Sequence, residues 1–350
     1  GKKKHVAYVS TYTMGDEHGI KIYDVDMKNG RLKEKGEVLI SNSSYVTISH
    51  NGKNLYSITD FGVESFAILK DGTLETINKA SINGMRGCYL STDYEDKYLF
   101  CAGYHDGKIT VLKLDQETGA VGTITDEVYH KGLGSIAERS FRPHISCVKM
   151  TRDNKYLCAA DLGIDYVNVY RLDHDKGTLK AVDIIRCELE TAPRHLKFSI
   201  DGKYMYVIGE MKNCIDVYAY TEVDGLPYFD QIQSISTTEI VEAQGVAASA
   251  LMISEDGKYI VASNAGENSV SLFEIDSEEG KLTRRFCLPI SGEYPKDACL
   301  FPDNRHLVSL NHESNTMTFF RVDMENDVIV MNGKEMKVDR PNCIIFHKLK

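Results

Sequence analysis

The sequence predicts an all-β protein, a seven-bladed β-propeller with four antiparallel strands in each blade. Three observations support this fold class: a turn signal recurs along the chain, each turn lies between two apolar-rich runs, and the two chain ends complement each other. The turns are spaced by roughly 44 to 58 residues, which is the range expected for a four-stranded propeller blade. We therefore expect one domain over residues 1–350.

The recurring turn consists of Gly, Asn or Asp followed by Lys or Arg. Type I′ hairpin turns need a positive φ angle, which these three residue types tolerate best. The six copies are Asn51-Gly52-Lys53, Glu95-Asp96-Lys97, Asp153-Asn154-Lys155, Asp201-Gly202-Lys203, Asp256-Gly257-Lys258 and Asp303-Asn304-Arg305.

The segments after each turn follow one order. A β-rich run comes first, for example YMYVIGE at 204–210, and an alternating run follows, for example CIDVYAY at 214–220. A second turn, often with Gly, then leads to a last strand such as TLETINKA at 73–80. Period-two alternation is typical of half-buried strands, and no segment shows a long amphipathic period of 3.6 residues. The pattern predicts strands throughout.

The chain ends supply the seventh blade. The N-terminal runs HVAYVSTY, GIKIYDVD and RLKEKGEVLI (5–12, 19–26 and 31–40) are three strands that lack a first one. The C-terminal run PNCIIFHKL (341–349) resembles a first strand and is followed by no second. One C-terminal strand joined to three N-terminal strands would close the ring and leave no open sheet edge.

Composition excludes several function classes. With 42% hydrophobic and 26% charged residues, the chain is typical of a soluble globular protein. A net charge of −10 repels nucleic acid and anionic membranes, and no apolar run is long enough to span a bilayer. The 9 cysteines are scattered and form no C-x-x-C motif. They predict reduced, buried thiols in the cytoplasm rather than disulfides or a zinc site.

Residues in equivalent positions of the repeats are expected to meet in space, because corresponding strand ends surround a propeller's central channel. We aligned the units on the Lys or Arg of the turn. The starts of the first strands then carry Ser44, Cys88, Ser146, Arg194, Ser249, Lys296 and, from the C-terminal strand, Asn342. The ends of the second strands carry Asp60, Tyr104, Asp161, Glu210, Asn264, His312 and, from the N-terminus, Thr11.

An antiparallel hairpin places these two sets together, so we expect both at one mouth of the channel. Two cations there, Arg194 and Lys296, predict an anionic ligand, and Arg suits carboxylate or phosphate. Glu210 is a candidate general base on a water or substrate proton. Alternatively, Arg194 pairs with Glu210 and stiffens the mouth. His195 either contacts the ligand or packs between blades.

The connection from 127 to 144 is the second candidate region. It contains His130, Arg139, Arg142 and His144, and it either covers the channel or is a solvated loop. Among its members His144, next to a strand start, is our candidate for catalysis. Asp161 either contacts the ligand or caps a turn. Ser146, Asn264 and His312 complete the expected substrate-binding set.

No cofactor is expected, since the sequence contains no Gly-rich phosphate loop, no metal-spaced histidine pair and no nucleophile elbow. Carboxylates at the channel mouth suit Ca²⁺, but the adjacent cations argue against a metal.

Four stretches carry a family resemblance: YVSTYT at 8–13, DLGIDYVNVY at 161–170, PRHLKFS with GKYMYVIGE at 193–210, and SNAGENSVSLFEID at 263–276. On these stretches the chain resembles the lactonase family of seven-bladed propellers, which includes 6-phosphogluconolactonases and carboxymuconate lactonising enzymes. The resemblance extends over essentially the whole chain. It implies metal-free hydrolysis or formation of a lactone derived from a sugar or an acid.

The resemblance assigns roles residue by residue. The arginine of the family's Pro-Arg-His matches Arg194, and the glutamate that follows matches Glu210. Three positions depart from the family: Ser146 replaces the second histidine of a Pro-His-x-His pattern, Ala265 replaces an arginine, and Lys296 replaces an arginine while keeping its charge.

Two functions therefore remain open. The first is a lactonase that hydrolyses an anionic sugar lactone such as 6-phosphogluconolactone. Its anionic group would lie on Arg194 and Lys296, and Glu210 or His144 would activate water. The second is a non-catalytic propeller that binds an anionic small molecule, as the replacements at Ser146 and Ala265 suggest.

Overall fold

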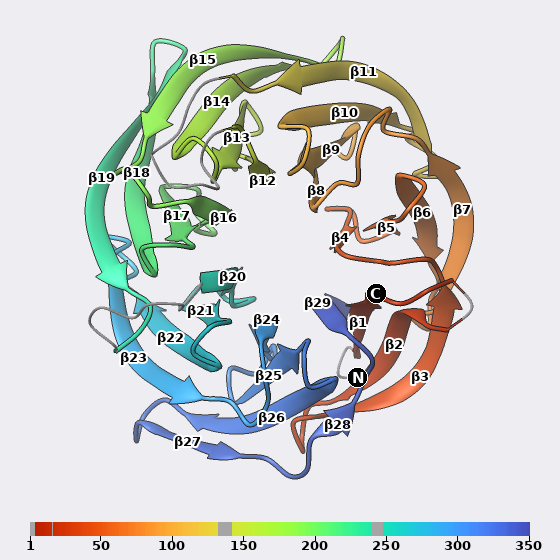
Figure 1. Cartoon of the computed structure of the whole chain (residues 1–350), viewed down its shortest axis with the longest axis vertical. Helices are drawn as coiled ribbons and strands as arrows, with labels where there is room; N and C mark the ends of the chain where they lie inside the picture. Colours follow the sequence, from red (N-terminus) through yellow and green to blue (C-terminus); the bar gives the residue numbers. More distant parts are fainter. Residues whose placement is uncertain (1–3, 16, 132–141, 240–247) are drawn as a thin grey trace. The chain divides into compact units, whose positions relative to one another are not determined.

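The computed structural model describes residues 4–15, 17–131, 142–239 and 248–350. Within these ranges the secondary structure is all strand, with no helix, and the strands form seven antiparallel sheets. Six sheets have four strands, and the seventh has a broken outer strand in which β27 and β28 both pair with β26. The predicted all-β, seven-bladed propeller is confirmed, and Figure 1 shows the strand order within each blade.

The strands fall at the predicted positions. The blade that contains both chain ends has β29 (Pro341–Lys348), β1 (His5–Thr11), β2 (Gly19–Asp26) and β3 (Arg31–Leu39). The next three blades have β4 (Val46–Ile48), β5 (Asn54–Ile58), β6 (Val63–Ile68) and β7 (Leu74–Ala80); β8 (Tyr89–Thr92), β9 (Tyr98–Gly103), β10 (Lys108–Leu114) and β11 (Val121–Tyr129); and β12 (Ile145–Met150), β13 (Tyr156–Asp161), β14 (Tyr166–Asp173) and β15 (Thr178–Arg186). The last three have β16 (Pro193–Phe198), β17 (Tyr204–Gly209), β18 (Cys214–Val223) and β19 (Leu226–Ser236); β20 (Ala248–Ile253), β21 (Tyr259–Asn264), β22 (Ser269–Ile275) and β23 (Leu282–Pro289); and β24 (Pro295–Leu300), β25 (His306–Asn311), β26 (Thr316–Asp323), β27 (Val328–Met331) and β28 (Met336–Lys337).

The backbone contacts group the chain into two compact units. The first unit comprises residues 1–44, 69–74 and 236–350, and it holds the blade of both chain ends and the two blades from β20 to β28. The second comprises residues 45–68 and 75–235, and it holds the four blades from β4 to β19, apart from the β6–β7 turn. The organisation as a single domain stays a prediction.

The predicted closing blade is confirmed. Strand β29 pairs antiparallel with β1, with His5 opposite Lys348 and Val9 opposite Ile344. The C-terminal strand therefore becomes the first strand of the N-terminal blade, and its backbone groups are satisfied in a sheet rather than left at an edge.

The six recurring turns contain the expected left-handed residue, but they are longer than the two-residue type I′ turns that we predicted. Gly52 has φ 74° and Asp96 has φ 55°. In the first turn Gly52 N donates to Ser49 O at 2.9 Å and Ser49 N donates to Asn54 O at 2.9 Å. Each loop is thus a four-residue turn whose fourth residue has positive φ, which Gly, Asn and Asp supply.

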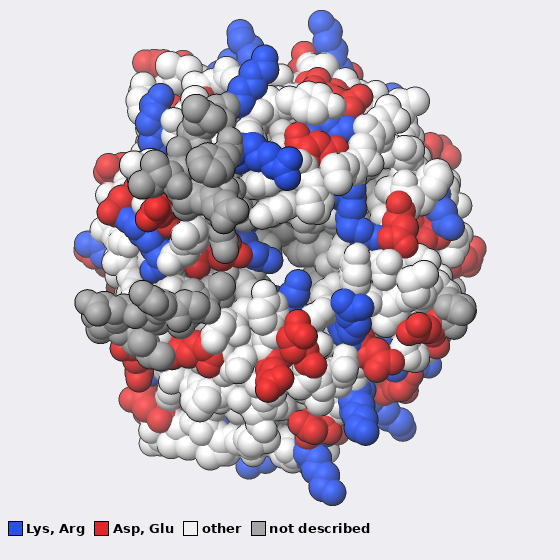
Figure 2. Space-filling view, viewed as in Figure 1, with Lys and Arg blue, Asp and Glu red and all other residues white. Residues whose placement is uncertain are grey.

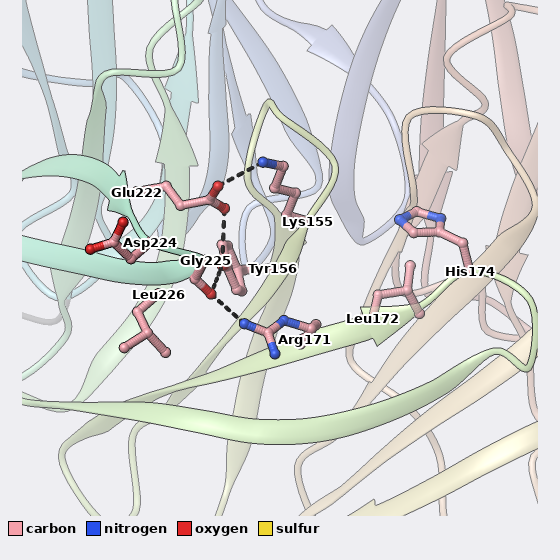
Figure 3. A pocket seen from close by; sticks show the side chains of 9 residues that line it. All are labelled: Lys155, Tyr156, Arg171, Leu172, His174, Glu222, Asp224, Gly225 and Leu226. Atoms are coloured by element: carbon pink, nitrogen blue, oxygen red, sulfur yellow. Dashed lines mark hydrogen bonds and ion pairs between the residues drawn. The ribbon is translucent and has the colours of Figure 1, made fainter.

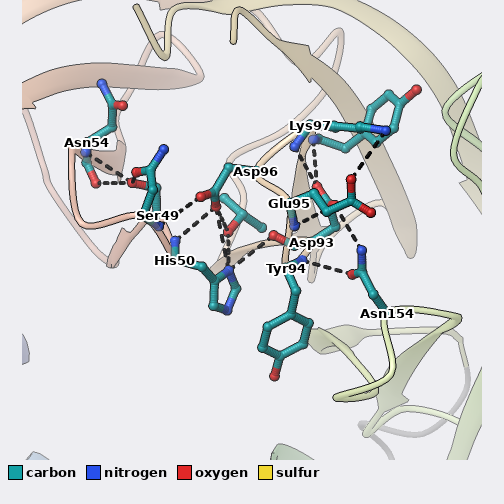
Figure 4. A network of polar contacts seen from close by, with 12 residues as sticks. Ser49, His50, Asn54, Asp93, Tyr94, Glu95, Asp96, Lys97 and Asn154 are labelled. Atoms are coloured by element: carbon teal, nitrogen blue, oxygen red, sulfur yellow. Dashed lines mark hydrogen bonds and ion pairs between the residues drawn. The ribbon is translucent and has the colours of Figure 1, made fainter. Parts of the chain in front are cut away.

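Side chains of these turns join neighbouring blades in the second unit (Figure 4). Asp96 accepts hydrogen bonds from the backbone N–H groups of His50 and Asn51, both at 2.9 Å. Asn154 Oδ1 accepts a bond from Tyr94 N at 2.8 Å in the same way. One turn therefore holds the backbone of the turn before it, which sets the register between successive blades.

The cores lie between sheets. In the second unit, Phe100, Val148 and Leu196 from three successive blades belong to one buried cluster. All 9 cysteines are free thiols within the described residues, and seven of them are buried, as the sequence predicted. Within the described ranges, no helix has the length and hydropathy that a membrane span requires. On the face drawn in Figure 2, side chains of both charge signs are interspersed.

Candidate functional site

Five of the seven first-strand positions that the sequence alignment brought together are β-bulges. In β16 the pairing with β17 shifts between Pro193 and His195, so Arg194 is the extra residue. Bulges re-aim a side chain and are common beside active sites. The same shift leaves Ser146, Ser249, Lys296 and Asn342 as the extra residues of β12, β20, β24 and β29.

A residue of positive φ lies two positions before three of these bulges. Ala192 precedes Pro193-Arg194 with φ 53°. A non-glycine residue in this region costs on the order of 1–3 kcal/mol, and such residues cluster at functional sites. Tyr294 (φ 59°) and Arg340 (φ 43°) occupy the same place before Pro295-Lys296 and Pro341-Asn342.

Each of these strained residues is held by an Asp or Asn side chain from the preceding blade. Asp165 Oδ1 accepts a hydrogen bond from Ala192 N at 2.8 Å, and its Oδ2 accepts one from Glu190 N at 2.9 Å. In the first unit Asn268 Oδ1 accepts from Tyr294 N at 2.7 Å, and Asn315 Oδ1 accepts from Arg340 N at 2.8 Å. The approach to each bulge is therefore rigidly positioned.

Arg194 and Glu210 form an ion pair, with 2.6 Å between Nη1 and Oε1. The side chain of Arg194 is 29% exposed and that of Glu210 is 12% exposed. The Nε of Arg194 is buried and has no hydrogen-bond partner among the described residues. An unsatisfied buried donor is costly, so this edge of the guanidinium is suited to an acceptor that the protein does not itself provide.

The side chain of Ser146 forms hydrogen bonds with the backbone. Its hydroxyl donates to Pro193 O at 2.9 Å and to Ala160 O at 3.2 Å. Ser249 makes the corresponding bond to Pro295 O at 2.6 Å in the first unit. Both bulge serines thus bind the carbonyl just before the cation of the next blade.

His144 has a defined tautomer. Its Nδ1 lies 2.7 Å from Tyr104 O, and because a carbonyl only accepts, Nδ1 carries the proton. The rings of His144 and Tyr104 stack with centroids 4.3 Å apart. In the neutral imidazole Nε2 therefore keeps a lone pair that can take a proton.

Asp161 caps a turn beneath His144, one of the two roles that the sequence left open. Its side chain is fully buried. Oδ1 accepts hydrogen bonds from His144 N at 2.8 Å and Gly163 N at 3.0 Å, and Oδ2 lies 2.7 Å from His130 Nδ1. Arg139 of the predicted loop cluster lies outside the described residues.

Cys88 interacts with Arg194 and with the backbone of Tyr104, which in turn contacts His144. Burial raises the pKa of its thiol to about 12, against the opposing effect of the Arg194 charge and a hydrogen bond with the Tyr104 backbone. The thiol also donates to Ile145 O at 3.3 Å. Since the Arg194 charge acts on Cys88 and Cys88 contacts the partner of His144, these residues share one neighbourhood. We call Cys88, Tyr104, His144, Ser146, Arg194 and Glu210 the arginine site.

His195 packs against an aromatic ring. Its imidazole meets Tyr89 edge-on, with centroids 5.2 Å apart. Burial, together with the charges of Arg194 and Lys197, holds the pKa of His195 well below its usual 6.5. The ring is therefore neutral near pH 7.

The remaining predicted residues lie in the first unit. Lys296 Nζ lies 5.8 Å from the centroid of the Tyr294 ring. His312 Nδ1 is 3.3 Å from Pro341 O, and burial and the Lys296 charge lower its pKa. Asn264 is fully buried, and its amide donates to Thr237 O at 3.1 Å. The role of these residues in substrate binding stays a prediction.

A cavity of about 740 Å³ lies away from the arginine site, between β13, β14 and the β18–β19 hairpin (Figure 3). Its polar groups bond one another: Lys155 Nζ lies 2.7 Å from Glu222 Oε1, and Tyr156 OH donates to Glu222 Oε2 and Gly225 O, both at 2.9 Å. None of the predicted site residues lines it. Among the described residues, no group of three or more His, Cys, Asp or Glu is placed to hold a metal ion.

Sequence reasoning missed the residues that hold the bulges. Asp165, Asn268 and Asn315 each lie four positions after the residue that ends a second strand (Asp161, Asn264 and Asn311). This constant spacing was available in the alignment. Their function could not be predicted from the alignment, because the groups that they bind come from the next blade.

Comparisons with known proteins show the family of the chain. The sequence profile of the family described as "Lactonase, 7-bladed beta-propeller" matches residues 6–346. The chain is 30% identical over 349 residues to the 6-phosphogluconolactonase of Bacillus subtilis, which covers 98% of both proteins. It is 31% identical over 347 residues to an uncharacterized protein of Staphylococcus saprophyticus, with 97% of this chain and 98% of that one covered.

Solved structures give the same result. The periplasmic gluconolactonase PpgL of Pseudomonas aeruginosa matches with a TM-score of 0.90 and 26% identity, covering 99% of this chain and 100% of that one. A structure from Bacteroides fragilis, assigned provisionally as a 6-phosphogluconolactonase, matches with a TM-score of 0.88 and 30% identity over 99% of this chain and 98% of that one.

Proposed function

Because the chain belongs to the family of seven-bladed β-propeller lactonases, we propose that it hydrolyses the ring ester of an anionic sugar lactone such as 6-phosphogluconolactone. The names of its relatives support this substrate class. The observation that carries the proposal is the buried Nε of Arg194, which has no partner among the described residues although Nη1 is held by Glu210.

Arg194 supplies fixed positive charge. A guanidinium stays protonated at any physiological pH and offers several donors in one plane. Its unpaired Nε is available to an oxygen of the substrate, either an anionic group or the carbonyl oxygen of the lactone. During attack by water that carbonyl oxygen becomes an oxyanion, and donors aimed at developing charge are a major source of catalysis.

His144 is the proposed general base. Its Nε2 lone pair takes a proton from water as the water oxygen bonds to the lactone carbonyl carbon. When the tetrahedral intermediate collapses, the ring C–O bond breaks and the departing oxygen takes the proton back from His144. The product is a hydroxy acid. Glu210, already bound to Arg194 at 2.6 Å, acts by holding the guanidinium in place.

The test is hydrolysis of 6-phosphogluconolactone, with the spontaneous rate subtracted. We expect a clear enzymatic rate for the wild type, and a loss of kcat/KM of about 100-fold or more for Arg194→Ala and His144→Ala, in line with the removal of an oxyanion donor or a general base. Arg321→Ala, at an exposed arginine of β26, is the matched control and should behave as the wild type. A wild-type rate equal to that of buffer would refute this substrate.

Non-catalytic binding of an anionic small molecule is the second candidate. It is favoured by Ser146, which stands where the family has a histidine and whose hydroxyl is bound to two carbonyls. In that case the wild type would bind the product of lactone hydrolysis with an affinity that depends on Arg194, but would not accelerate hydrolysis.

Substrate binding by Lys296 is a separate proposal, and it predicts that Lys296→Ala raises KM more than it lowers kcat. We place the reaction in the cytoplasm, because nine free thiols suit a reducing compartment. Cell fractionation tests this placement, since one structural relative is periplasmic.

A further inference from the structure

Two lysines occupy the same position in neighbouring blades. Lys149 of β12 and Lys197 of β16 each lie six residues before the turn lysine of their own sheet. Both are half-buried, and the charge of Lys197 acts on Lys149. Lys149 lies three residues after Ser146 and Lys197 three residues after Arg194, and Cys147 Sγ of β12 donates to Leu196 O of β16 at 3.9 Å. The two lysines therefore hold equivalent positions in neighbouring strands beside the arginine site.

No acidic group compensates them. Lys197 Nζ lies 3.1 Å from Tyr89 OH and 5.6 Å from the centroid of the same ring. Two other side chains act on Lys149. Arg152 is positively charged, and the thiol of Cys147 stays protonated because burial raises its pKa. Within the described part of the chain, neither lysine forms an ion pair with a carboxylate.

Lys108, a lysine with a purely structural role, has hydrogen-bond acceptors for its ammonium group. Lys108 is 2% exposed, and its Nζ donates to Glu127 Oε2 at 2.9 Å, Ile82 O at 2.8 Å and Asn83 O at 3.0 Å. Its three protons thus have three acceptors. Among the described residues, Lys149 has no such acceptor and Lys197 has only the hydroxyl of Tyr89, although unpaired ammonium groups are costly to bury.

The neighbouring rings add no negative charge. Burial raises the pKa of Tyr89 well above 10, so its hydroxyl stays protonated, and it already takes part in side-chain hydrogen bonds with Tyr45, Cys147 and Lys197. The imidazole of His195 is neutral near pH 7 because burial lowers its pKa. Around the two lysines there is thus a protonated hydroxyl and a neutral ring but no negative charge, so the ammonium groups are suited to an oxyanion.

We infer that Lys149 and Lys197 form a phosphate site, distinct from Arg194 and suited to the phosphate group of a phosphorylated sugar lactone. The source of the phosphate rests on the proposed function, whereas the site itself does not. A phosphate monoester carries close to two negative charges at pH 7, which matches two ammonium groups. Arg194 would then be left for the oxygen of the lactone carbonyl.

Proton uptake is a specific consequence of this arrangement. Burial, followed by the charge of Lys197, lowers the pKa of Lys149 to about 7. A bound dianion stabilises the ammonium form and raises that pKa again. At a pH well above 7, where Lys149 is mostly neutral and inorganic phosphate is already almost entirely the dianion, binding of phosphate should therefore take up protons from the buffer.

The first experiment is calorimetric titration of the purified protein with inorganic phosphate, in two buffers of different ionisation enthalpy. We expect binding with proton uptake by the wild type, and affinity reduced about tenfold or more for Lys197→Met, as for the loss of one charge-assisted contact. Lys113→Met, at an exposed lysine of β10, should bind as the wild type does. Absence of binding, or equal binding by Lys197→Met, would overturn the phosphate site.

Stability separates a ligand lysine from a structural one. Because Lys149→Met removes a poorly compensated ammonium group, it should raise the denaturation midpoint while phosphate binding is lost. A lower midpoint together with lost binding would identify Lys149 as a structural residue and contradict the inference.

Kinetics identify the source of the phosphate. If the site takes the substrate's phosphate, Lys197→Met raises KM for 6-phosphogluconolactone about tenfold and leaves KM for unphosphorylated gluconolactone unchanged. Inorganic phosphate then also competes with the substrate. If phosphate binds without competing, the site takes free phosphate. Arg194→Ala should retain phosphate binding even where hydrolysis is lost, so failure of the proposed function is distinguishable from failure of this site.

Discussion

Ser146 Oγ donates a hydrogen bond of 2.9 Å to Pro193 O, the carbonyl immediately before Arg194. The bulge residue of β12 is thus bound to the backbone that presents Arg194. Ser249 repeats this bond with Pro295 O, immediately before Lys296. A serine hydroxyl at the bulge of one blade positions the cation at the bulge of the next.

Ser146→Ala should therefore weaken both the fold and the site. The loss of one buried hydrogen bond lowers the free energy of unfolding by about 1 kcal/mol, and looser placement of Arg194 should reduce kcat/KM several-fold. Urea denaturation and lactone hydrolysis measure the two effects. Ser146→Cys is the conservative control, because the thiol of Cys88 already bonds the next blade in this way. Equal stability and activity in Ser146→Ala would show that the bond has no such role.

Asp165→Ala should cost more than Asp165→Asn. The buried carboxylate holds Ala192 N and Glu190 N, and its removal leaves two N–H groups unsatisfied, for a loss of roughly 2–4 kcal/mol of unfolding free energy. Asn keeps one acceptor oxygen, as Asn268 and Asn315 do at the equivalent positions. Chemical denaturation measures the difference, and equal losses in the two variants would contradict this account.

The stability of the protein should fall as the pH drops below about 6.5, partly through His195. Its pKa in the folded protein lies well below 6.5 because of burial and the charges of Arg194 and Lys197. In the unfolded chain the imidazole takes up a proton near pH 6.5, whereas the folded protein does not. The contribution is thus complete above pH 6.5 and is lost as the pH falls toward the folded pKa.

His195→Phe removes this titration and keeps a ring against Tyr89. The slope of unfolding free energy against pH should become shallower by at most about 1.4 kcal/mol per pH unit, the value for one proton. His312 and His347, whose pKa values are also lowered chiefly by burial, retain part of the dependence. An unchanged slope in His195→Phe would rule out a contribution from His195.

The prediction of a single domain has its own measurement. We expect one cooperative calorimetric transition for the whole chain, with equal calorimetric and van't Hoff enthalpies. Two resolved transitions would instead indicate that the units 1–44, 69–74 and 236–350, and 45–68 and 75–235, unfold independently.

Local chemistry made the fold predictable. Residues such as Gly52 and Asp96 mark turns because few residue types tolerate positive φ, and both have φ in that region. The alignment also found the bulge residues, Arg194 among them, because every blade repeats the same spacing. It did not identify them as bulges, since a bulge is a property of the pairing between two strands.

The sequence by itself determined the strands, their turns, the number of blades, the closing strand and the columns of residues from which the arginine site is built. Only the tertiary structure decided how each polar side chain is used. Ser146 is bound to Pro193 O, Asp161 caps a turn, and Arg194 Nε has no acceptor among the described residues. The physical reason is that a buried donor or acceptor is satisfied by groups distant in the chain, and their positions follow from the packing of one blade on the next.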